Sequence, residues 1–232
     1  MKRLKIAPRH SKVDKSLNPS LDPTDPAAGL LPTFAACLIA LVVGLGFVYS
    51  ATDRGRAFTT ENLRRSEVAR QPVSIPDFTV FDASGRKQSL RELLTHGNRV
   101  WIVDFVYTRC QTVCSSLGTI YQQLQSEIVA RGLEGRVGLL SISFDPANDR
   151  PASLRDYALR MHMHPEAWQI VSLDQTQDRR RLLDTFGIMV VPAPLGEFEH
   201  NAALHIIDRE ARLVHIVDYT KPDAALELAL SR

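Results

Sequence analysis

The fold is decided by the stretch Val100-Trp101-Ile102-Val103-Asp104-Phe105-Val106-Tyr107-Thr108-Arg109-Cys110-Gln111-Thr112-Val113-Cys114. Its first half is rich in apolar, β-branched and aromatic residues, which predicts a buried strand. After this stretch the apolar residues recur at helical spacing, at Leu117, Ile120, Tyr121, Leu124 and Ile128. The two cysteines are therefore expected where a strand ends and a helix begins.

The pair Cys110 and Cys114 has the chemistry of a redox or metal site. Two thiols separated by three residues in the first turn of a helix lie on nearly the same face. The unpaired N–H groups and the positive end of the helix dipole favour thiolate over thiol there. Such a pair can form a disulfide or hold a soft metal ion. Two buried, inert thiols are the alternative, and the position at a strand-to-helix turn argues against them.

The composition limits the classes of function. The chain has 232 residues, of which 44% are hydrophobic, and this is enough for one sizeable core. The net charge is +2, and residues 1–50 contribute six Lys and Arg against three Asp. The remainder is close to neutral, which gives no electrostatic argument for nucleic-acid binding. Three cysteines are too few for a disulfide scaffold.

The N-terminal part predicts a membrane anchor. Residues 1–26 are polar, basic and rich in proline, and we interpret them as a disordered cytoplasmic tail. Residues 27–50 carry no charge, and about 20 helical residues span a bilayer core. The basic tail places the N-terminus in the cytoplasm and the rest of the chain outside it. A signal peptide cleaved near Ala51 is the alternative, and the long tail and long apolar run argue against cleavage.

The rest of the chain alternates between predicted strands and helices. Residues 51–71 are charged and are expected to form a linker or a short, exposed helix, before a globular domain at 72–232. Alternating elements followed by a hairpin predict an α/β sandwich with a mixed sheet. The expected strands are 75–82, 100–106, 137–144, 168–173, 202–207 and 213–217, and the expected helices are 89–94, 115–132, 153–163, 174–186 and 222–230.

Two segments of this domain resemble one known family. Residues 105–114, together with the segment Ser143-Phe144-Asp145-Pro146-Ala147-Asn148-Asp149, look like the Sco/SenC family. The resemblance runs from about Ile75 to Ile216, which is nearly the whole predicted domain. Members of that family are membrane-anchored, thioredoxin-like copper proteins linked to assembly of cytochrome c oxidase. The resemblance therefore implies a thioredoxin-like sandwich for residues 72–232.

The resemblance also implies a ligand set. The family has a histidine before the hairpin strand as its third copper ligand, and His200 matches it, so Cys110, Cys114 and His200 would bind the metal. Two thiolates and one imidazole form a soft donor set that suits Cu(I) and accepts Cu(II). A closed structural zinc site would normally need four ligands. Gln111 and Ser115 stand where family members usually carry proline.

The function implied by the resemblance is that of a metallochaperone. Such a protein would bind copper, as Cu(I) or Cu(II), and assist copper-site assembly in cytochrome c oxidase. Its partners would be the copper-bearing subunit of that oxidase and other copper or thiol-redox proteins, with one helix in the inner membrane. The domain would then lie in the periplasm or an equivalent extracytoplasmic space.

Two enzyme hypotheses stay open beside the metallochaperone. The first is a thiol–disulfide oxidoreductase in which Cys110 and Cys114 act on partner cysteines. The second is a peroxidase, which needs a Thr and an Arg around the reactive cysteine, and Thr108 and Arg109 are the residues available. His200 discriminates in part, because copper binding needs it and dithiol exchange does not.

Other metal-type residues have simpler interpretations. Met161-His162-Met163-His164 follows a helix, where a histidine suits the C-terminal dipole, although thioether and imidazole groups also bind copper. Asp145 and Asp149 are carboxylates, which suit harder ions. We expect the Phe-Asp-Pro loop that contains Asp145 to cap the next helix or turn rather than to bind copper.

Overall fold

The structure is a computed structural model that describes residues 26–51, 60–109, 113–193 and 197–232. Side chains are described over 32–50, 61–109, 117–193 and 197–232. The chain divides into two compact units, Met1–Ala51 and Thr52–Arg232.

The first unit contains helix α1 (Pro26–Ala51). Its candidate membrane span is Pro32–Ser50, a stretch of 19 residues with mean hydropathy 2.1 and none of it buried. By length and composition this helix is long and apolar enough to cross a membrane, and it is the only such helix in the described part of the chain. The predicted N-terminal apolar helix is therefore present as a candidate span.

The second unit is built on a mixed sheet. Within the described residues the sheet has eight strands, in the order β1-β10-β9-β4-β5-β6-β2-β3. Strands β4, β5 and β6 are parallel neighbours, and antiparallel strands flank them on both sides. The strands are β1 (Val73–Ser74), β2 (Thr79–Asp82), β3 (Lys87–Ser89), β4 (Val100–Val106), β5 (Val137–Ser143), β6 (Trp168–Leu173), β9 (Ala203–Ile207) and β10 (Arg212–Asp218).

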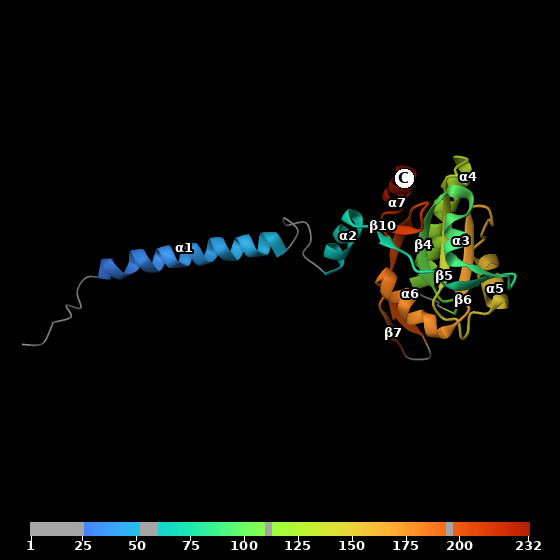
Figure 1. Cartoon of the computed structure of the whole chain (residues 1–232), viewed down its shortest axis with the longest axis horizontal. Helices are drawn as coiled ribbons and strands as arrows, with labels where there is room; N and C mark the ends of the chain where they lie inside the picture. The colour runs from blue at the N-terminus through green and yellow to red at the C-terminus, as the bar shows by residue number, and fades with distance from the viewer. Residues whose placement is uncertain (1–25, 52–59, 110–112, 194–196) are drawn as a thin grey trace, which may run out of the picture. The chain divides into compact units, whose positions relative to one another are not determined.

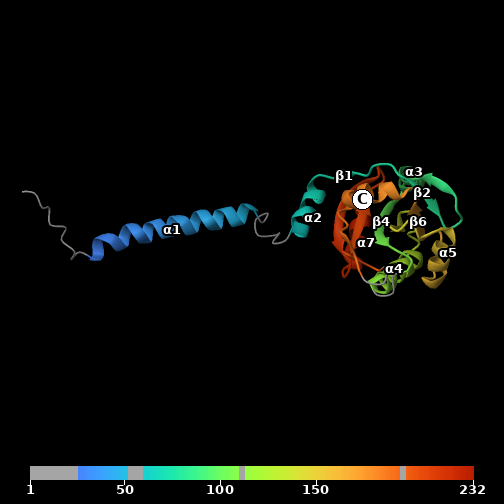
Figure 2. The ribbon, with the colours of Figure 1, turned by 90° about the horizontal axis from the view of Figure 1, so that it is seen from below.

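Helices cover both faces of this sheet (Figures 1 and 2). Trp101 of β4 donates its indole N–H to the carbonyl of Leu94 on one face, and Phe105 packs on Phe186 of α6 on the same face. On the other face the α4 residue Tyr121 donates its hydroxyl to the carbonyl of Ile102. The helices are α2 (Thr60–Arg70), α3 (Leu90–Thr95), α4 (Val113–Ala130), α5 (Pro151–Arg160), α6 (Arg179–Phe186) and α7 (Pro222–Leu230), with short 3-10 turns at His96–Asn98 and Thr176–Asp178.

The α/β sandwich with a mixed sheet is confirmed, and so are its main elements. Ser89 caps α3 by accepting the N–H of Glu92, and β9 pairs with β10 as the expected hairpin. Several elements differ from expectation, among them the short strands β1 and β3, which were not predicted. Helix α2 is not fully exposed, because Val68 is buried. A second, two-stranded sheet pairs β7 (Val190–Pro192) with β8 (Phe198–His200), where no strands were predicted.

One charged residue interrupts the apolar central strand. Asp104 of β4 is 1% exposed and lies on the α4 face of the sheet, opposite to Trp101 and Phe105. The hydroxyls of Ser141 and Tyr121 lower the pKa of this carboxyl, but desolvation is stronger and raises it to about 7. A carboxyl with this pKa can gain or lose a proton near neutral pH while it remains inside the core.

This burial predicts a pH dependence of stability. An unfolded Asp loses its proton near pH 3.8 and the folded Asp104 near pH 7, so the folded state binds more protons between these values and stability falls as the pH rises. Asp104→Asn removes that term, and from pH 5 to pH 8 it should gain about 2–3 kcal/mol of unfolding free energy relative to wild type. Urea unfolding followed by tryptophan fluorescence measures this difference. A difference that does not change with pH would contradict the assignment, and the exposed Asp156→Asn serves as the control.

Candidate metal centre

The two cysteines flank the junction between β4 and α4. Strand β4 ends at Val106 and helix α4 begins at Val113, so Cys114 is the second residue of the helix. Cys110 and the side chain of Cys114 lie outside the described residues. What the structure does describe is how the chain is held on either side of this junction.

A buried carboxylate holds the last residues before Cys110. Asp149, which is fully buried, accepts hydrogen bonds from the Thr108 N–H at 2.9 Å and from the Thr108 hydroxyl at 2.6 Å. It also accepts the hydroxyl of Ser143, at the end of β5, at 2.6 Å. The carbonyl of Thr108 accepts from Arg160 of α5 at 3.0 Å. Every polar group of Thr108 is thus engaged, which fixes the path of the chain into the cysteine segment.

Burial and hydrogen bonding act against each other at Asp149. Desolvation raises the pKa of this carboxyl, while the bonds from Ser143 and Thr108 lower it, and the outcome is a raised pKa. The stabilisation of the Asp149 carboxylate therefore depends on these bonds, because no basic side chain pairs with it among the described residues. Loss of any of these hydrogen bonds would therefore destabilise the Asp149 carboxylate and loosen the position of Thr108.

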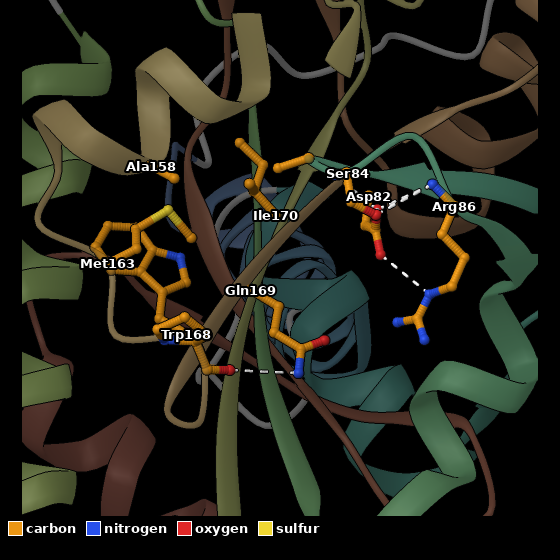
Figure 3. Close-up of a pocket in the computed structure, with 10 residues that line it drawn as sticks. Asp82, Ser84, Arg86, Ala158, Met163, Trp168, Gln169 and Ile170 are labelled. Carbon is orange, nitrogen blue, oxygen red and sulfur yellow. Dashed lines mark hydrogen bonds and ion pairs between the residues drawn. The ribbon is translucent and has the colours of Figure 1, made fainter. Parts of the chain in front are cut away.

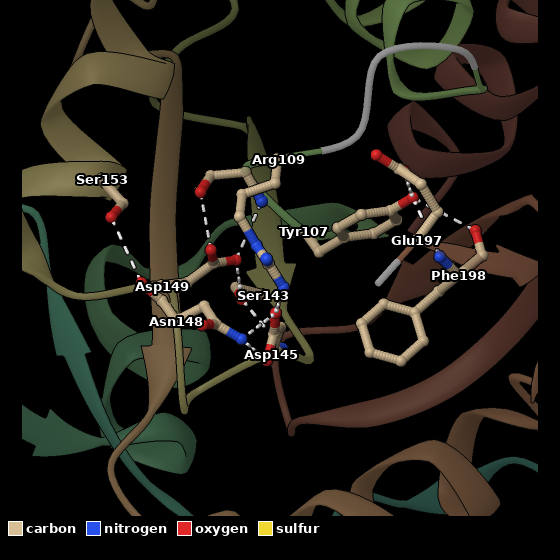
Figure 4. A network of polar contacts seen from close by, with 10 residues as sticks. Tyr107, Arg109, Ser143, Asp145, Asn148, Asp149, Ser153, Glu197 and Phe198 are labelled. Atoms are coloured by element: carbon tan, nitrogen blue, oxygen red, sulfur yellow. Dashed lines mark hydrogen bonds and ion pairs between the residues drawn. The ribbon is translucent and has the colours of Figure 1, made fainter. Parts of the chain in front are cut away.

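A second acidic residue continues the network to Arg109 (Figure 4). Asp145 accepts from the Arg109 guanidinium at 3.1 Å and from the Asn148 amide at 2.9 Å and 3.0 Å. Asp145 is buried and the Arg109 side chain is half exposed. We expected this loop to cap the next helix or turn: the helix cap is not formed, since Arg150 at the N-cap of α5 makes no side-chain cap bond, whereas Asp145 does hold the turn through Asn148. Asp145 and Asp149 also tie the loop to Thr108 and Arg109.

His200 approaches the same region from another part of the chain. It is the last residue of β8 and pairs with Val190 of β7. Its half-buried ring packs on Phe144 with centroids 5.2 Å apart and on Tyr107 with centroids 6.4 Å apart. Tyr107 lies three residues before Cys110. The fold therefore packs the His200 ring against Tyr107, in the part of the chain that leads into the cysteines.

Hydrogen bonds fix the hairpin that carries His200. The hydroxyl of Tyr107 donates to the Glu197 carboxylate at 2.5 Å and accepts the Phe198 N–H at 3.2 Å, as Figure 4 shows. Beyond His200, the Asn201 amide oxygen accepts the Met189 N–H at 2.7 Å and its NH₂ donates to the Gly187 carbonyl at 3.0 Å. The Nδ1 of His200 lies 3.0 Å from the Asn201 carbonyl. His200 is thus held between two anchored residues.

The Met161-to-His164 segment does not converge on a site. Met161 lies against Gly118 of α4, where an added Cβ would approach its sulfur to 2.5 Å. Met163 instead lines a surface pocket of about 290 Å³ that includes Trp168, with Asp82 and Arg86 on the other side (Figure 3). The two thioethers therefore have different neighbours. Among all described residues no group of three or more His, Cys, Asp or Glu side chains is arranged to hold a metal ion.

Three supporting residues were missed by sequence reasoning. Asp149 was considered only as a metal ligand by type or as part of a capping loop, and its partner Thr108 lies 41 positions away. Tyr107 and Asn201 were given no supporting role. Each acts through a long-range contact, for which the local sequence gives no signal.

The comparisons with known proteins agree on one family. A family model described as SCO1/SenC matches residues 67–232. A curated relative, the SCO1 protein homolog of Bacillus subtilis (strain 168), is 25% identical over 143 residues, which are 60% of this chain and 71% of the relative. The predicted family is therefore confirmed.

Solved structures share the fold. BsSco, a member of the Sco family of cytochrome c oxidase assembly proteins in which a disulfide switch was identified, has a TM-score of 0.59 and 22% identity, covering 69% of this chain and 94% of that one. Yeast Sco1 with copper bound has a TM-score of 0.55 and 20% identity, covering 69% and 91%. The predicted thioredoxin-like fold is confirmed.

The network at Thr108 yields a mutational prediction. Asp149→Ala leaves two buried hydroxyls and one N–H without their acceptor, so the unfolding free energy should fall by about 2–4 kcal/mol. Urea unfolding at pH 7 measures the change. Asp156→Ala, which removes an exposed carboxylate on α5, should leave stability within about 0.5 kcal/mol of wild type. Equal stability of the two variants would show that Asp149 does not hold this segment.

Proposed function

This chain belongs to the SCO1/SenC family, and from that premise we propose that it is a membrane-anchored copper metallochaperone that assists copper-site assembly in cytochrome c oxidase. The observation that carries the proposal is the packing of His200 on Tyr107, three residues before Cys110. It supports one copper site formed by a strand–helix junction and a distant hairpin. The relatives that were solved with copper bound share this fold.

In this proposal Cys110, Cys114 and His200 are the copper ligands. The two cysteines are four positions apart in the sequence, so the short chain between them limits their separation. Their thiolates suit Cu(I), while Cu(II) favours nitrogen donors and higher coordination. His200 therefore contributes more to Cu(II) than to Cu(I). Its contribution depends on the fold, because it arrives on β8 from about 90 residues away along the chain.

The same pair makes copper binding depend on redox state. Oxidation of Cys110 and Cys114 to a disulfide removes both thiolates together and leaves His200 as a single ligand. Only the dithiol form then binds copper tightly. The disulfide and the copper-binding dithiol are thus two states of one cysteine pair.

The alternative is a thiol–disulfide oxidoreductase that acts on partner cysteines. It uses the same pair and does not need His200. The peroxidase hypothesis finds less support, since the Thr108 hydroxyl donates to Asp149 and the Arg109 guanidinium pairs with Asp145. Both groups are thus engaged in contacts within the protein, and these described contacts do not orient them toward a peroxide substrate.

We propose that helix α1 anchors the protein in the cytoplasmic membrane, with the basic residues 1–26 in the cytoplasm and the domain in the periplasm or an equivalent space. The partner would be the copper-bearing subunit of the oxidase, reached from the membrane surface. Other copper or thiol-redox proteins would deliver the metal or reduce the pair. The domain boundaries in this proposal are 27–50 for the span, 51–71 for the linker and 72–232 for the thioredoxin-like domain.

Copper titrations of single variants test the proposed ligands. Cys110→Ser and Cys114→Ser should lower Cu(I) and Cu(II) affinity by at least about 100-fold, more than the loss of an outer partner of a metal ligand costs. His200→Ala should weaken Cu(II) far more than Cu(I). The full-length reduced protein in detergent is titrated with Cu(I) against a competing chelator and with Cu(II) by visible absorption.

The controls separate ligand loss from other effects. His96→Ala removes an exposed imidazole at a 3-10 turn and should bind both ions like wild type. The oxidised wild-type protein should lose tight binding of both ions. If His200→Ala binds both ions like wild type, His200 is not a ligand and the oxidoreductase becomes the better account.

A further inference from the structure

Helix α2 is packed on the domain, although its residues were expected in a linker. It lies beside β10 (Figure 1), where Val68 is buried and Arg65 forms an ion pair with Asp218 at 3.8 Å. The neighbouring Arg64 has only 25% of its side chain exposed, and its ion pair with Glu61 is long, at 4.0 Å. Burial lowers the pKa of Arg64, because the guanidinium loses part of its hydration. The position of Arg64 therefore needs an explanation beyond this ion pair.

The guanidinium of Arg64 covers the backbone of Gly187, where α6 ends. A Cβ atom at position 187 would overlap with the Cζ, Nε and Nη1 atoms of Arg64, which are the three nearest atoms outside its chain neighbours. Gly187 has a φ of 64°, a left-handed conformation that glycine adopts without strain at the end of a helix. The partial negative charge at that end favours a cation. Gly187 thus leaves room for the guanidinium, and the end of α6 attracts it.

An open space borders this contact. Residues of α2 and α6 line a cavity of about 420 Å³, among them Arg64, Val68 and Thr185. A side chain at such a place can be shortened without the sealed void that a large-to-small change leaves in a core. Loss of the guanidinium should therefore uncover Gly187 and leave the rest of the domain folded.

Gly187 is also one of the points to which the β7–β8 hairpin is attached. Its carbonyl accepts the side-chain NH₂ of Asn201 at 3.0 Å, and the Asn201 amide oxygen accepts the Met189 N–H at 2.7 Å. Asn201 follows His200 directly, and its carbonyl lies 3.0 Å from the His200 Nδ1. A continuous series of described contacts thus connects Arg64 of α2 to His200 of β8.

We propose that Arg64 is a positioning residue for His200, which makes α2 a part of the copper-binding unit. By covering Gly187, Arg64 holds the point at which Asn201 fixes the hairpin, and this limits the positions that the imidazole can take. The role rests on the proposed function of His200 as a copper ligand. Because Cu(II) favours nitrogen donors and two thiolates satisfy Cu(I), the positioning matters more for Cu(II).

Hydrogen exchange tests the positioning in copper-free protein. In Arg64→Ala the backbone N–H of Met189, which reports the Asn201 anchor, should exchange about 5- to 30-fold faster than in wild type. The N–H of Leu139, which is bonded within the central sheet, should keep its wild-type rate. Full-length reduced protein in detergent is measured by NMR. A wild-type rate at Met189 in Arg64→Ala would overturn the proposal.

Two further variants show whether the effect belongs to the guanidinium of Arg64. Arg65→Ala is the matched control, because it removes the ion pair of α2 with Asp218 and keeps Arg64, so the Met189 N–H should exchange at the wild-type rate. An acceleration as large as that in Arg64→Ala would contradict a specific role of Arg64. If Arg64→Ala does not fold, Arg64→Gln, which keeps most of the stem and loses the guanidinium, should give the same acceleration.

A double-mutant cycle tests whether Arg64 acts through Gly187. Gly187→Ala displaces the guanidinium in the wild-type background, whereas in the Arg64→Ala background the same change adds only the strain of the left-handed backbone. The acceleration of Met189 exchange by Gly187→Ala should therefore be smaller in the Arg64→Ala background. Equal accelerations in the two backgrounds would show that the contact does not couple the two residues and would overturn the proposal.

Copper titration of the same samples separates this proposal from the proposed function. Arg64→Ala should lower Cu(II) affinity by about 2- to 30-fold, the range for residues coupled through a contact network, and leave Cu(I) affinity unchanged. If His200→Ala weakens Cu(II) binding and Arg64→Ala does not, the ligand stands and the role of Arg64 fails. If Met189 exchange responds to Arg64→Ala while His200→Ala binds Cu(II) like wild type, the ligand assignment fails and the positioning of the hairpin by Arg64 stands.

Discussion

The site depends first on the hydrogen bonds that the buried Asp149 accepts from Thr108 and Ser143. Thr108 and Arg109, which follow β4, lie in a turn, and a turn has no ladder of backbone bonds to hold it. Asp149 replaces that ladder with three hydrogen bonds, two from Thr108 and one from Ser143, and Arg160 donates to the remaining polar group of Thr108, its carbonyl. Because these bonds are shielded from water, they stabilise one path of the chain into Cys110. This arrangement leaves the Asp149 carboxylate buried with no counter-ion among its described partners.

A second, independent anchor holds the histidine. The β7–β8 hairpin is attached to the end of β4 by Tyr107 and to the end of α6 by Asn201. Rings of Tyr107, Phe144 and Phe198 pack together beside His200, and Arg179 lies over Phe198 at 4.9 Å from the ring centroid. His200, the ligand that we propose, thus lies on a small hairpin held by two anchors. The proposed function needs copper to be both held and released, and we expect the hairpin to move as one piece when its anchors loosen.

Much of this fold could be predicted, because the spacing of apolar residues along the chain can be read from the local sequence. The apolar run at β4 and the helical spacing from Leu117 onward indicated the strand–helix junction, and the expected strands 202–207 and 213–217 indicated the β9–β10 hairpin. The β7–β8 hairpin was missed since its strands are three residues each and include Pro192. Asp104 was grouped with an apolar run, although a carboxyl inside such a run is itself a signal of chemistry.

The supporting residues of the site could not be predicted for a different reason. Thr108 and Asp149 are 41 positions apart, and Tyr107 and Glu197 are 90 apart. Residue type alone assigned the Asp145 loop a capping role, whereas the fold gives it an ion pair with Arg109. Cys110 and Cys114 were found from their own spacing, whereas His200 was found only through the resemblance to a family. The roles of all three rest on chemistry that a direct view of the metal can test.

Copper K-edge X-ray absorption of the Cu(II)-loaded full-length protein gives that view. The account predicts two sulfur neighbours and the multiple scattering of one imidazole, with the imidazole signal lost in His200→Ala and kept in His96→Ala. A spectrum without sulfur neighbours, or an imidazole signal that survives in His200→Ala, would contradict a copper site built from Cys110, Cys114 and His200.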